Sequence, residues 1–479
     1  MGITRRSRGG LERPVAPAGT RTALILSACL VATLASAAPA AERFALPEFK
    51  SGYERPTPET PEPRDDALEW VDLAVLAAAL GLASYLALSA RSRRWIWLLM
   101  FLAFIYFGLW RGGCICAVGS VQNVALALGD ASYAVPLAVL GFFLLPLVAT
   151  LLFGRTFCAA VCPLGAIQDL VAVRPVGVPR WLDHGLGLLA YLYVGAAVLF
   201  AATGAAFIIC EYDPFVSLFR LIPLGRAGST MDAFPGSLTM VAVGVGVLAL
   251  GIFVARPYCR WVCPYGAVLR VLSRFSWKHV TITPDECVQC RLCEEACPVG
   301  AIRKPNADEP PPDRVIGRRR LATLLILVPV LLAAGAAGGW ALGPPMARMH
   351  YTVRQADRVR LEEVGRVEDA EDISDAFYTT QRPKEDLYAE AAAVVGRFRT
   401  GGLLLGLWAG LVVGMKLIHL SIDRRRTDYL PDRAACVSCG RCFAYCPVEQ
   451  KRRKEKQGGK RFQESFSPGA KRPTPPGTR

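Results

Sequence analysis

Two stretches of the chain each carry four cysteines at the spacing Cys-x2-Cys-x2-Cys-x3-Cys-Pro. Runs of this kind fold a short loop around a [4Fe–4S] cluster, because three thiolates bind three irons and the fourth cysteine binds the cluster of the other run. The spacing therefore predicts two clusters that exchange one ligand each. Two structural zinc sites are the alternative, since zinc needs only Cys-x2-Cys pairs, but the complete runs favour clusters. The first cluster would take Cys287, Cys290, Cys293 and Cys446, and the second would take Cys436, Cys439, Cys442 and Cys297.

A second pattern is a repeat, Arg-x-aromatic-Cys-x2-Val-Cys-Pro-x-Gly-Ala, at residues 155–166 and 256–267. Cysteines four residues apart lie on one side of a helical turn. Two such pairs that meet would supply four thiolates, enough for a third cluster or another soft-metal site. Inert buried cysteines are the usual alternative, but the duplication favours a site. Its residues would be Cys158, Cys162, Cys259 and Cys263.

A degraded third copy begins at Cys114 and Cys116, where Ala117 replaces the proline. Cys210 opens the segment Cys-Glu-Tyr-Asp-Pro-Phe further along the chain. These three cysteines could form a periplasmic redox site, either by holding a metal together with Asp213 or by thiol–disulfide exchange. Packing cysteines explain them equally well.

The composition places the chain in a membrane. Of 479 residues, 53% are hydrophobic and 20% are charged, with a net charge of +15; a soluble domain has about a quarter of its residues charged. Apolar stretches long enough to cross about 30 Å of hydrocarbon recur seven times. We therefore predict an all-α polytopic membrane protein with about seven transmembrane helices and a bacterial-ferredoxin-like 2[4Fe–4S] module built from two separated segments. The predicted spans are 69–90, 95–113, 134–153, 185–208, 237–255, 320–343 and 400–421.

The N-terminus predicts an export signal, since arginines precede an apolar run over 23–34 and small residues follow at 35–37. Lipidation of Cys29 is an alternative that the length of the apolar run disfavours. Lys and Arg are enriched in cytoplasmic loops, and this rule puts both cysteine runs and the C-terminus on the cytoplasmic face of the cell inner membrane. The predicted divisions are a signal sequence (1–37), a periplasmic proline-rich linker (38–68), a transmembrane core with the Cys-x3-Cys-Pro repeats (69–274), a first ferredoxin-like segment (275–319), a transmembrane helix (320–343), a periplasmic loop (344–399), a transmembrane helix (400–421), a second ferredoxin-like segment (422–450) and a basic disordered tail (451–479).

The remaining titratable residues narrow the chemistry. The chain has four histidines, none of them at the centre of a predicted helix, so haem ligation is set aside. Lys416 and His419 could snorkel to the membrane interface or accept protons from a quinol head group. The basic tail would hold anionic lipid at about 1 kcal/mol per residue, and a docking site for an acidic partner is the alternative. No phosphate-binding loop, hydrolytic triad or nucleic-acid module is present in the sequence.

The ordered combination of these motifs over residues 68–447 resembles the NosR/NirI-type membrane iron–sulfur proteins, which are associated with nitrous oxide respiration. The resemblance implies electron supply to, or maintenance of, the periplasmic copper enzyme nitrous oxide reductase. Members of that family resemble one another in a periplasmic flavin-binding domain between the signal and the first helix. Here that interval holds only the linker, so no FMN is expected on this chain, and a separate periplasmic flavoprotein would complete the path.

Two functions follow as hypotheses. The first is an electron-transfer component, rather than a stand-alone catalyst, that passes electrons from quinol or a cytoplasmic donor toward a periplasmic acceptor. The second is a redox-sensing regulatory protein, or an assembly protein for a periplasmic copper enzyme.

Overall fold

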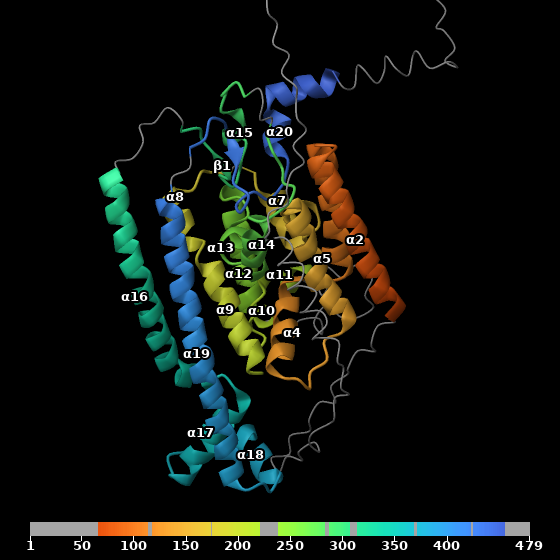
Figure 1. Cartoon of the computed structure of the whole chain (residues 1–479). Helices are drawn as coiled ribbons and strands as arrows, with labels where there is room; N and C mark the ends of the chain where they lie inside the picture. The colour runs from red at the N-terminus through yellow and green to blue at the C-terminus, as the bar shows by residue number, and fades with distance from the viewer. Residues whose placement is uncertain are drawn as a thin grey trace, which may run out of the picture.

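The computed structural model describes residues 66–113, 117–173, 175–220, 238–282, 287–306, 314–367, 371–422 and 425–455. The predicted signal sequence with Cys29, the linker before residue 66 and the tail after residue 455 lie outside these ranges, as do Cys114 and Cys116. Helices run roughly side by side through the body of the molecule, with α15, β1 and α20 at one end and α17 and α18 at the other (Figure 1).

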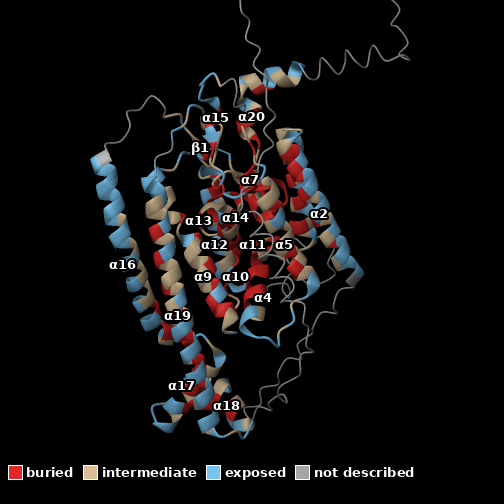
Figure 2. Ribbon diagram, in the orientation of Figure 1, coloured by how far each residue is buried: buried red, intermediate tan, exposed pale blue. Residues whose placement is uncertain are grey.

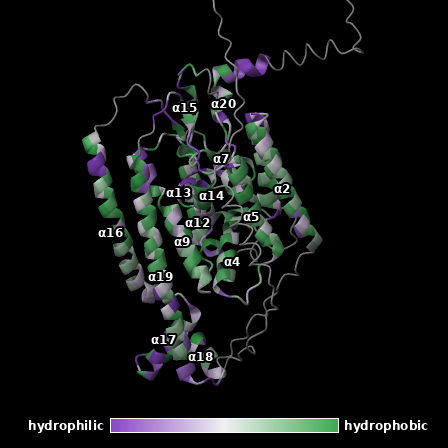
Figure 3. Ribbon diagram, viewed as in Figure 1, coloured by the Kyte–Doolittle hydropathy of each residue, from purple (hydrophilic) through white to green (hydrophobic). Residues whose placement is uncertain are grey.

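Among the residues that the structure describes, five helical segments are long and apolar enough to cross a membrane, and Figure 3 shows that the helices of the bundle are mostly hydrophobic along their length. The first is α2 (Asp66–Leu88), and the second joins α3 (Arg93–Ala103) to the π-helix η1 (Phe104–Trp110). The third joins α8 (Arg180–Leu186) to α9 (Leu189–Ala202). The last two are α16 (Arg314–Ala347) and α19 (Lys384–Ser421). The chain is therefore a multi-pass membrane protein.

Two of the seven predicted spans coincide with shorter apolar helices. These are α5 (Leu137–Phe153), of 17 residues, and α12 (Leu238–Phe253), of 16 residues. At 1.5 Å per residue each is about 25 Å long, which is less than the usual hydrocarbon thickness of about 30 Å. The count of seven therefore stays a prediction.

Short helices fill the centre of the bundle, where Figure 2 shows the buried residues concentrated. One of them, α4 (Ala117–Gly129), packs against α9 and α5. The remaining central helices are α6 (Thr156–Ala160), α7 (Pro163–Val171), α10 (Ile208–Glu211), α11 (Pro214–Arg220), α13 (Pro257–Trp261) and α14 (Pro264–Ser273).

Glycines let α16 and α19 form a close antiparallel hairpin. A Cβ added at Gly406 would overlap the carbonyl oxygen of Gly335, and one at Gly339 would overlap that of Gly402. Small residues at such contacts allow helix backbones to approach closely in lipid. The hairpin fixes where the chain leaves the first cysteine run and where it returns to the second.

The predicted periplasmic loop 344–399 is largely helical. It contains α17 (Tyr351–Glu363), α18 (Asp372–Thr379) and the first part of α19. Ion pairs hold these elements together, with 2.8 Å between Lys384 Nζ and Glu363 Oε1 and 3.1 Å between Arg358 Nε and Glu371 Oε2. Helix α19 therefore continues well beyond its apolar part.

The two cysteine runs lie side by side at the other end of the bundle. Strands β1 (Ile302–Arg303) and β2 (Leu430–Pro431) pair antiparallel, and α15 (Leu292–Glu295) contacts α20 (Arg441–Tyr445). The backbone N–H of Asp432 donates to Ala301 O at 2.8 Å. Arg303 adds an ion pair to the Asp432 carboxylate at 2.8 Å. These contacts join segments that the α16–α19 hairpin separates in the sequence.

The prediction of a disordered tail from residue 451 is wrong at its start, because residues 447–455 are helical. The Arg453 guanidinium donates to Ala90 O at 2.8 Å, and nearby Glu449 pairs with Arg91 at 2.9 Å. The helix therefore continues because its side chains bind the loop between α2 and α3.

Candidate metal centres

The structure brings together the four cysteines predicted for the first cluster. Three of them come from the loop before α15 and from α15 itself, and Cys446 comes from the end of α20. All four line one small cavity, which Ile282 and Tyr429 close with apolar surface. Burial, followed by the nearby thiols of Cys287 and Cys290, raises the pKa of Cys293 to about 11. Mutually repelling thiolates in an apolar surrounding require positive charge between them, as iron would supply.

The second predicted set is also assembled from both runs. Burial raises the pKa of Cys442, and the neighbouring thiols of Cys436, Cys439 and Cys297 raise it further. Burial likewise raises the pKa of Cys436 to about 12, with Cys439 and Cys297 again among the causes. Cys297, from the first run, therefore lies with the three cysteines of the second run.

The two loops share a backbone conformation that the sequence did not reveal. The residues on either side of the central cysteine have positive φ in both loops: Gln289 (52°) and Arg291 (64°) in the first, Ser438 (55°) and Gly440 (76°) in the second. Only one of the four is glycine, so the surrounding structure must hold the other three in a conformation that costs roughly 1–2 kcal/mol each. Alternating backbone conformations of this kind turn successive N–H groups inward and form anion-binding concavities typical of iron–sulfur sites.

Backbone N–H groups point at sulfur in both runs. Ala301 N–H donates to Cys297 Sγ at 3.2 Å, and Ser438 N–H donates to Cys436 Sγ at 3.4 Å. Such hydrogen bonds stabilise thiolate and tune the potential of a cluster that the thiolate binds.

The four cysteines of the Cys-x3-Cys-Pro repeats also converge. Burial raises the pKa of Cys162, and the thiols of Cys259, Cys158 and Cys263 raise it further. Each repeat folds alike, as a five-residue helix (α6, α13), a break, and a second helix (α7, α14) with proline in its first turn. Proline suits this position because the first N–H groups of a helix have no intrahelical acceptor. We call Cys158, Cys162, Cys259 and Cys263 the core set.

The repeated glycine of each motif has a steric reason. A Cβ at Gly165 would lie 3.1 Å from Cys158 O, and one at Gly266 would lie 3.3 Å from Cys259 O. Glycine also brings its N–H close to sulfur, since Gly266 N–H donates to Cys263 Sγ at 3.3 Å. Because both positions lack a Cβ, the first turn of the second helix in each repeat can pack closely against the carbonyl group of the first cysteine.

A buried glutamine supports the core set and was missed by the sequence prediction. The Gln168 side chain is fully buried. Its amide donates to Cys259 Sγ at 3.2 Å, and its oxygen accepts the backbone N–H of Tyr258 at 3.1 Å. Only the alignment of the third copy, which matches this glutamine, could have drawn attention to it.

Two buried arginines surround the core set. Arg256 donates to both oxygens of Asp169, at 3.1 and 3.0 Å, and to Cys158 O. Arg155 lies with one nitrogen 3.6 Å from Cys158 Sγ and another 3.3 Å from Ala434 O in the second run. The repeated arginines therefore place permanent positive charge beside the thiols.

The outer group is described only in part, because Cys114 and Cys116 lie outside the described residues. Cys210 accepts a hydrogen bond from Gln122 Nε2 at 3.3 Å, and Gln122 Oε1 accepts the backbone N–H of Ile209 at 2.6 Å. This is the same unit that Gln168 forms with Tyr258 and Cys259. The glutamine of the third copy therefore supports Cys210 in the way that Gln168 supports Cys259.

Among the described residues, no three His, Cys, Asp or Glu side chains lie close enough to hold one metal ion. Instead, the thiols of the first set face a shared cavity. That arrangement fits four thiolates that bind four different irons of one cubane.

Membrane-spanning helices and convergent cysteine sets define a multi-pass membrane protein of the iron–sulfur class. Residues 135–183 with 237–282, which carry both Cys-x3-Cys-Pro repeats, match a family described as a 4Fe-4S binding domain. Residues 280–303 match a second family of the same description.

The resemblance to NosR/NirI-type membrane polyferredoxins is confirmed for part of the chain. The chain is 35% identical to Protein NirI of Paracoccus denitrificans over 165 residues, which are 32% of this chain and 22% of NirI. It is 32% identical to Regulatory protein NosR of Stutzerimonas stutzeri over 163 residues, 32% of this chain and 21% of NosR. Putative electron transport protein YccM of Escherichia coli is 27% identical over 163 residues, 32% of this chain and 43% of YccM. The chain thus spans less than half the length of each of these relatives. No solved structure matches it significantly.

Proposed function

We propose that the chain is a membrane electron-transfer protein with two [4Fe–4S] clusters in its ferredoxin-like module and a third in the core. The first cluster is held by Cys287, Cys290, Cys293 and Cys446, and the second by Cys436, Cys439, Cys442 and Cys297. The core set holds the third, and the family match across both repeats supports iron–sulfur chemistry there. When bound, each cluster accepts and returns one electron.

The observation that carries this proposal is the connection between the core set and the second run. Arg155 contacts Cys158 Sγ on one side and Ala434 O on the other. Arg93 makes a parallel link, donating to Cys439 O at 2.8 Å while lying 3.7 Å from Asp169. The cysteine sets therefore follow one another from the bundle centre into the module, as an electron relay requires.

The module end is assigned to the cytoplasm and the membrane to the cell inner membrane. The helix end of α16 on the module side carries Arg318, Arg319 and Arg320, and arginine-rich ends face the cytoplasm. Helices α17 and α18 then lie on the periplasmic side.

Electrons must still cross about 30 Å of hydrocarbon. The group of Cys114, Cys116 and Cys210 would be the outer stepping stone, and a separate periplasmic flavoprotein would take over from it. By resemblance to NosR and NirI, the final acceptor is nitrous oxide reductase or its maturation machinery, so the role belongs to denitrification. The donor is quinol or a cytoplasmic reductant.

A regulatory role is the second candidate, because two of the relatives are named as regulatory proteins. In that role the clusters would report redox state through the folded unit of α17 and α18, which ion pairs hold to α19. Electron transfer is favoured because the connected cysteine sets serve no purpose in a sensor that needs one cluster.

Reconstitution in liposomes tests the proposal. With reductant inside, an impermeant acceptor outside and the periplasmic partners present, the parent protein should reduce the acceptor. Cys162→Ser should abolish this transfer while the module clusters remain visible by EPR. Equal transfer by Cys162→Ser and parent would remove the core set from the path, and no transfer by the parent would leave the regulatory role.

A further inference from the structure

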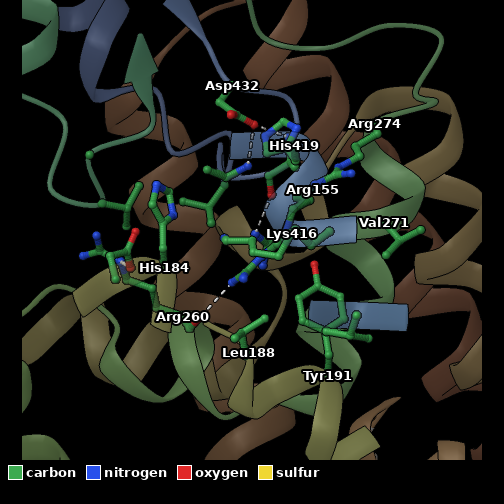
Figure 4. A pocket seen from close by; sticks show the side chains of 18 of the residues that line it. Arg155, His184, Leu188, Tyr191, Arg260, Val271, Arg274, Lys416, His419 and Asp432 are labelled. Atoms are coloured by element: carbon green, nitrogen blue, oxygen red, sulfur yellow. Dashed lines mark hydrogen bonds and ion pairs between the residues drawn. The ribbon is translucent and has the colours of Figure 1, made fainter. Parts of the chain in front are cut away.

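A cavity of about 300 Å³ lies at the module end of the bundle, between α8, α9, α14, α19 and the two cysteine runs (Figure 4). This volume is at the lower end of the range for small-molecule sites. In Figure 4, Lys416 and Arg155 lie at its centre, with Leu188 and Tyr191 on one side and His419 and Asp432 on the other. Apolar side chains thus lie on the side away from the module, where Arg260 lies beside Leu188, and polar side chains lie toward the module.

The apolar part is formed by spanning helices. Leu188, in the turn before α9, and Tyr191 of α9 line this part of the cavity. The apolar lining residues of α19 recur at three- and four-residue steps and so occupy one helix face: they are Trp408, Leu411, Val412 and Met415.

The polar part carries basic side chains, three of which have no hydrogen bond or ion pair in the described chain. His184, Lys416 and His419 line the cavity, and none of them has a hydrogen bond or ion pair with the residues that the structure describes. Arg155 and Arg270 also line the cavity with permanent positive charge. A ligand with oxygen acceptors would accept hydrogen bonds from cations placed in this way.

The cavity reaches both neighbouring redox sets. Cys259 of the core set is part of its lining, and so is Val437, which follows Cys436 in the second run. A ligand here would be close enough to exchange electrons with either set. An anionic phospholipid head group also suits cations, but it needs only the exposed Arg180 and Arg274 at the rim, not a cavity that extends to Cys259.

We infer that this cavity binds the head group of a quinol–quinone pair, an inference that rests on the electron-transfer function proposed above. The ring and tail lie against the apolar face of α19, and the ring oxygens accept hydrogen bonds from Arg155 and Arg270. Oxidation of quinol breaks two O–H bonds and leaves quinone, two protons and two electrons. The electrons pass singly to two oxidised iron–sulfur clusters of the neighbouring sets. The protons pass to His184 and His419 and then to water.

The surrounding cations assist this step. Positive charge favours the deprotonated form of an adjacent acid. Arg155, Arg270 and Lys416 therefore stabilise the quinol anion, which gives up electrons more readily than the neutral quinol does.

Filling the cavity tests the inference with a matched control on the next residue. Val412 lines the cavity and Val413 does not. Val412→Trp and Val413→Trp therefore add the same bulk, but only Val412→Trp fills the cavity. Equilibrium binding of decylubiquinone to the detergent-solubilised holoprotein should weaken by about tenfold or more in Val412→Trp, a change well beyond assay error. Reduction of the clusters by decylubiquinol should slow in parallel. Val413→Trp should behave as the parent, and dithionite should bleach the clusters of all three proteins.

The outcomes separate this inference from the function on which it rests. Unchanged quinone binding and reduction in Val412→Trp would overturn the assigned cavity. Binding of cardiolipin vesicles, but not of decylubiquinone, by the parent would assign the cavity to lipid instead. Clusters that dithionite fails to reduce would contradict the proposed function. If Val412→Trp lacks iron, Val271→Trp on the opposite wall, whose side chain is 41% exposed, replaces it with the same expectation.

Discussion

Replacing Arg155 by glutamine removes a permanent positive charge from the junction between the core set and the module. The side chain is 3% exposed. Burial lowers the pKa of Arg155, but the thiols of Cys158, Cys259 and Cys263 together raise it above its ordinary value, so the guanidinium stays charged. Removing that charge makes it harder to add an electron to a cluster on the core set.

The expected size of the effect follows from the 3.6 Å between Arg155 Nη2 and Cys158 Sγ. Two unit charges at that distance interact by about 4.6 kcal/mol at an effective dielectric constant of about 20. For a one-electron centre this corresponds to about 200 mV, at 59 mV per tenfold change. Because the added electron spreads over the whole cluster, we expect the potential to fall by roughly 100 mV.

EPR-monitored redox titration of purified protein measures this shift. Arg155→Lys keeps the charge and should restore most of the potential. Arg180→Gln removes an exposed cation at the cavity rim, which solvent screens, and should shift the potential by less than about 20 mV. A shift that small in Arg155→Gln, or a shift to higher potential, would refute the electrostatic reasoning.

Two further variants test the local structure. Gly165→Ala places a methyl group 3.1 Å from Cys158 O, and we expect the protein to lose about four irons per chain. Gly177→Ala, whose Cβ meets nothing within 4 Å, should keep all of its iron. Equal iron content in the two variants would show that the core set tolerates the methyl group. Burial raises the pKa of Asp432, but hydrogen bonds from Arg303 more than offset this and hold the pKa below its usual value. Its stabilisation is therefore present above the unfolded pKa of about 3.9 and lost as pH falls through the lower folded pKa. Asp432→Asn should lower the unfolding free energy by about 1–2 kcal/mol equally at pH 7 and pH 5, as followed by thermal loss of visible absorbance, and a difference that vanishes at pH 5 would contradict the assignment.

Local spacing predicted which cysteines the structure brings together, because each run is a continuous loop whose geometry depends on nearby residues. Cys287, Cys290 and Cys293 come together within seven residues. The spacing also gave the exchange of Cys446 and Cys297, which the structure places with the opposite runs. Whether iron fills these sets stays a prediction.

The supporting residues could not be predicted because they depend on contacts between distant segments. Gln168 and Cys259 are 91 positions apart, and Arg155 reaches Ala434 across 279 positions. No periodicity or local motif encodes such pairs. The left-handed backbone conformation of residues such as Arg291 could not be predicted either, because these residue types do not usually adopt it.

The predicted boundaries of the membrane-spanning helices differ from the structure for another reason. Hydropathy detects only the apolar part of a helix, so residues 384–399 of α19 were assigned to a loop. Their polar side chains do not stop the helix, because this part packs against α17. Conversely, α5 and α12 are apolar throughout but shorter than the predicted spans.

The content of iron and acid-labile sulfide in protein purified anaerobically tests the central claim most directly. Three cubanes predict about 12 irons and 12 sulfides per chain. About eight of each would remove the core set from the cluster sites. Protein that contains zinc and no iron would contradict the whole account.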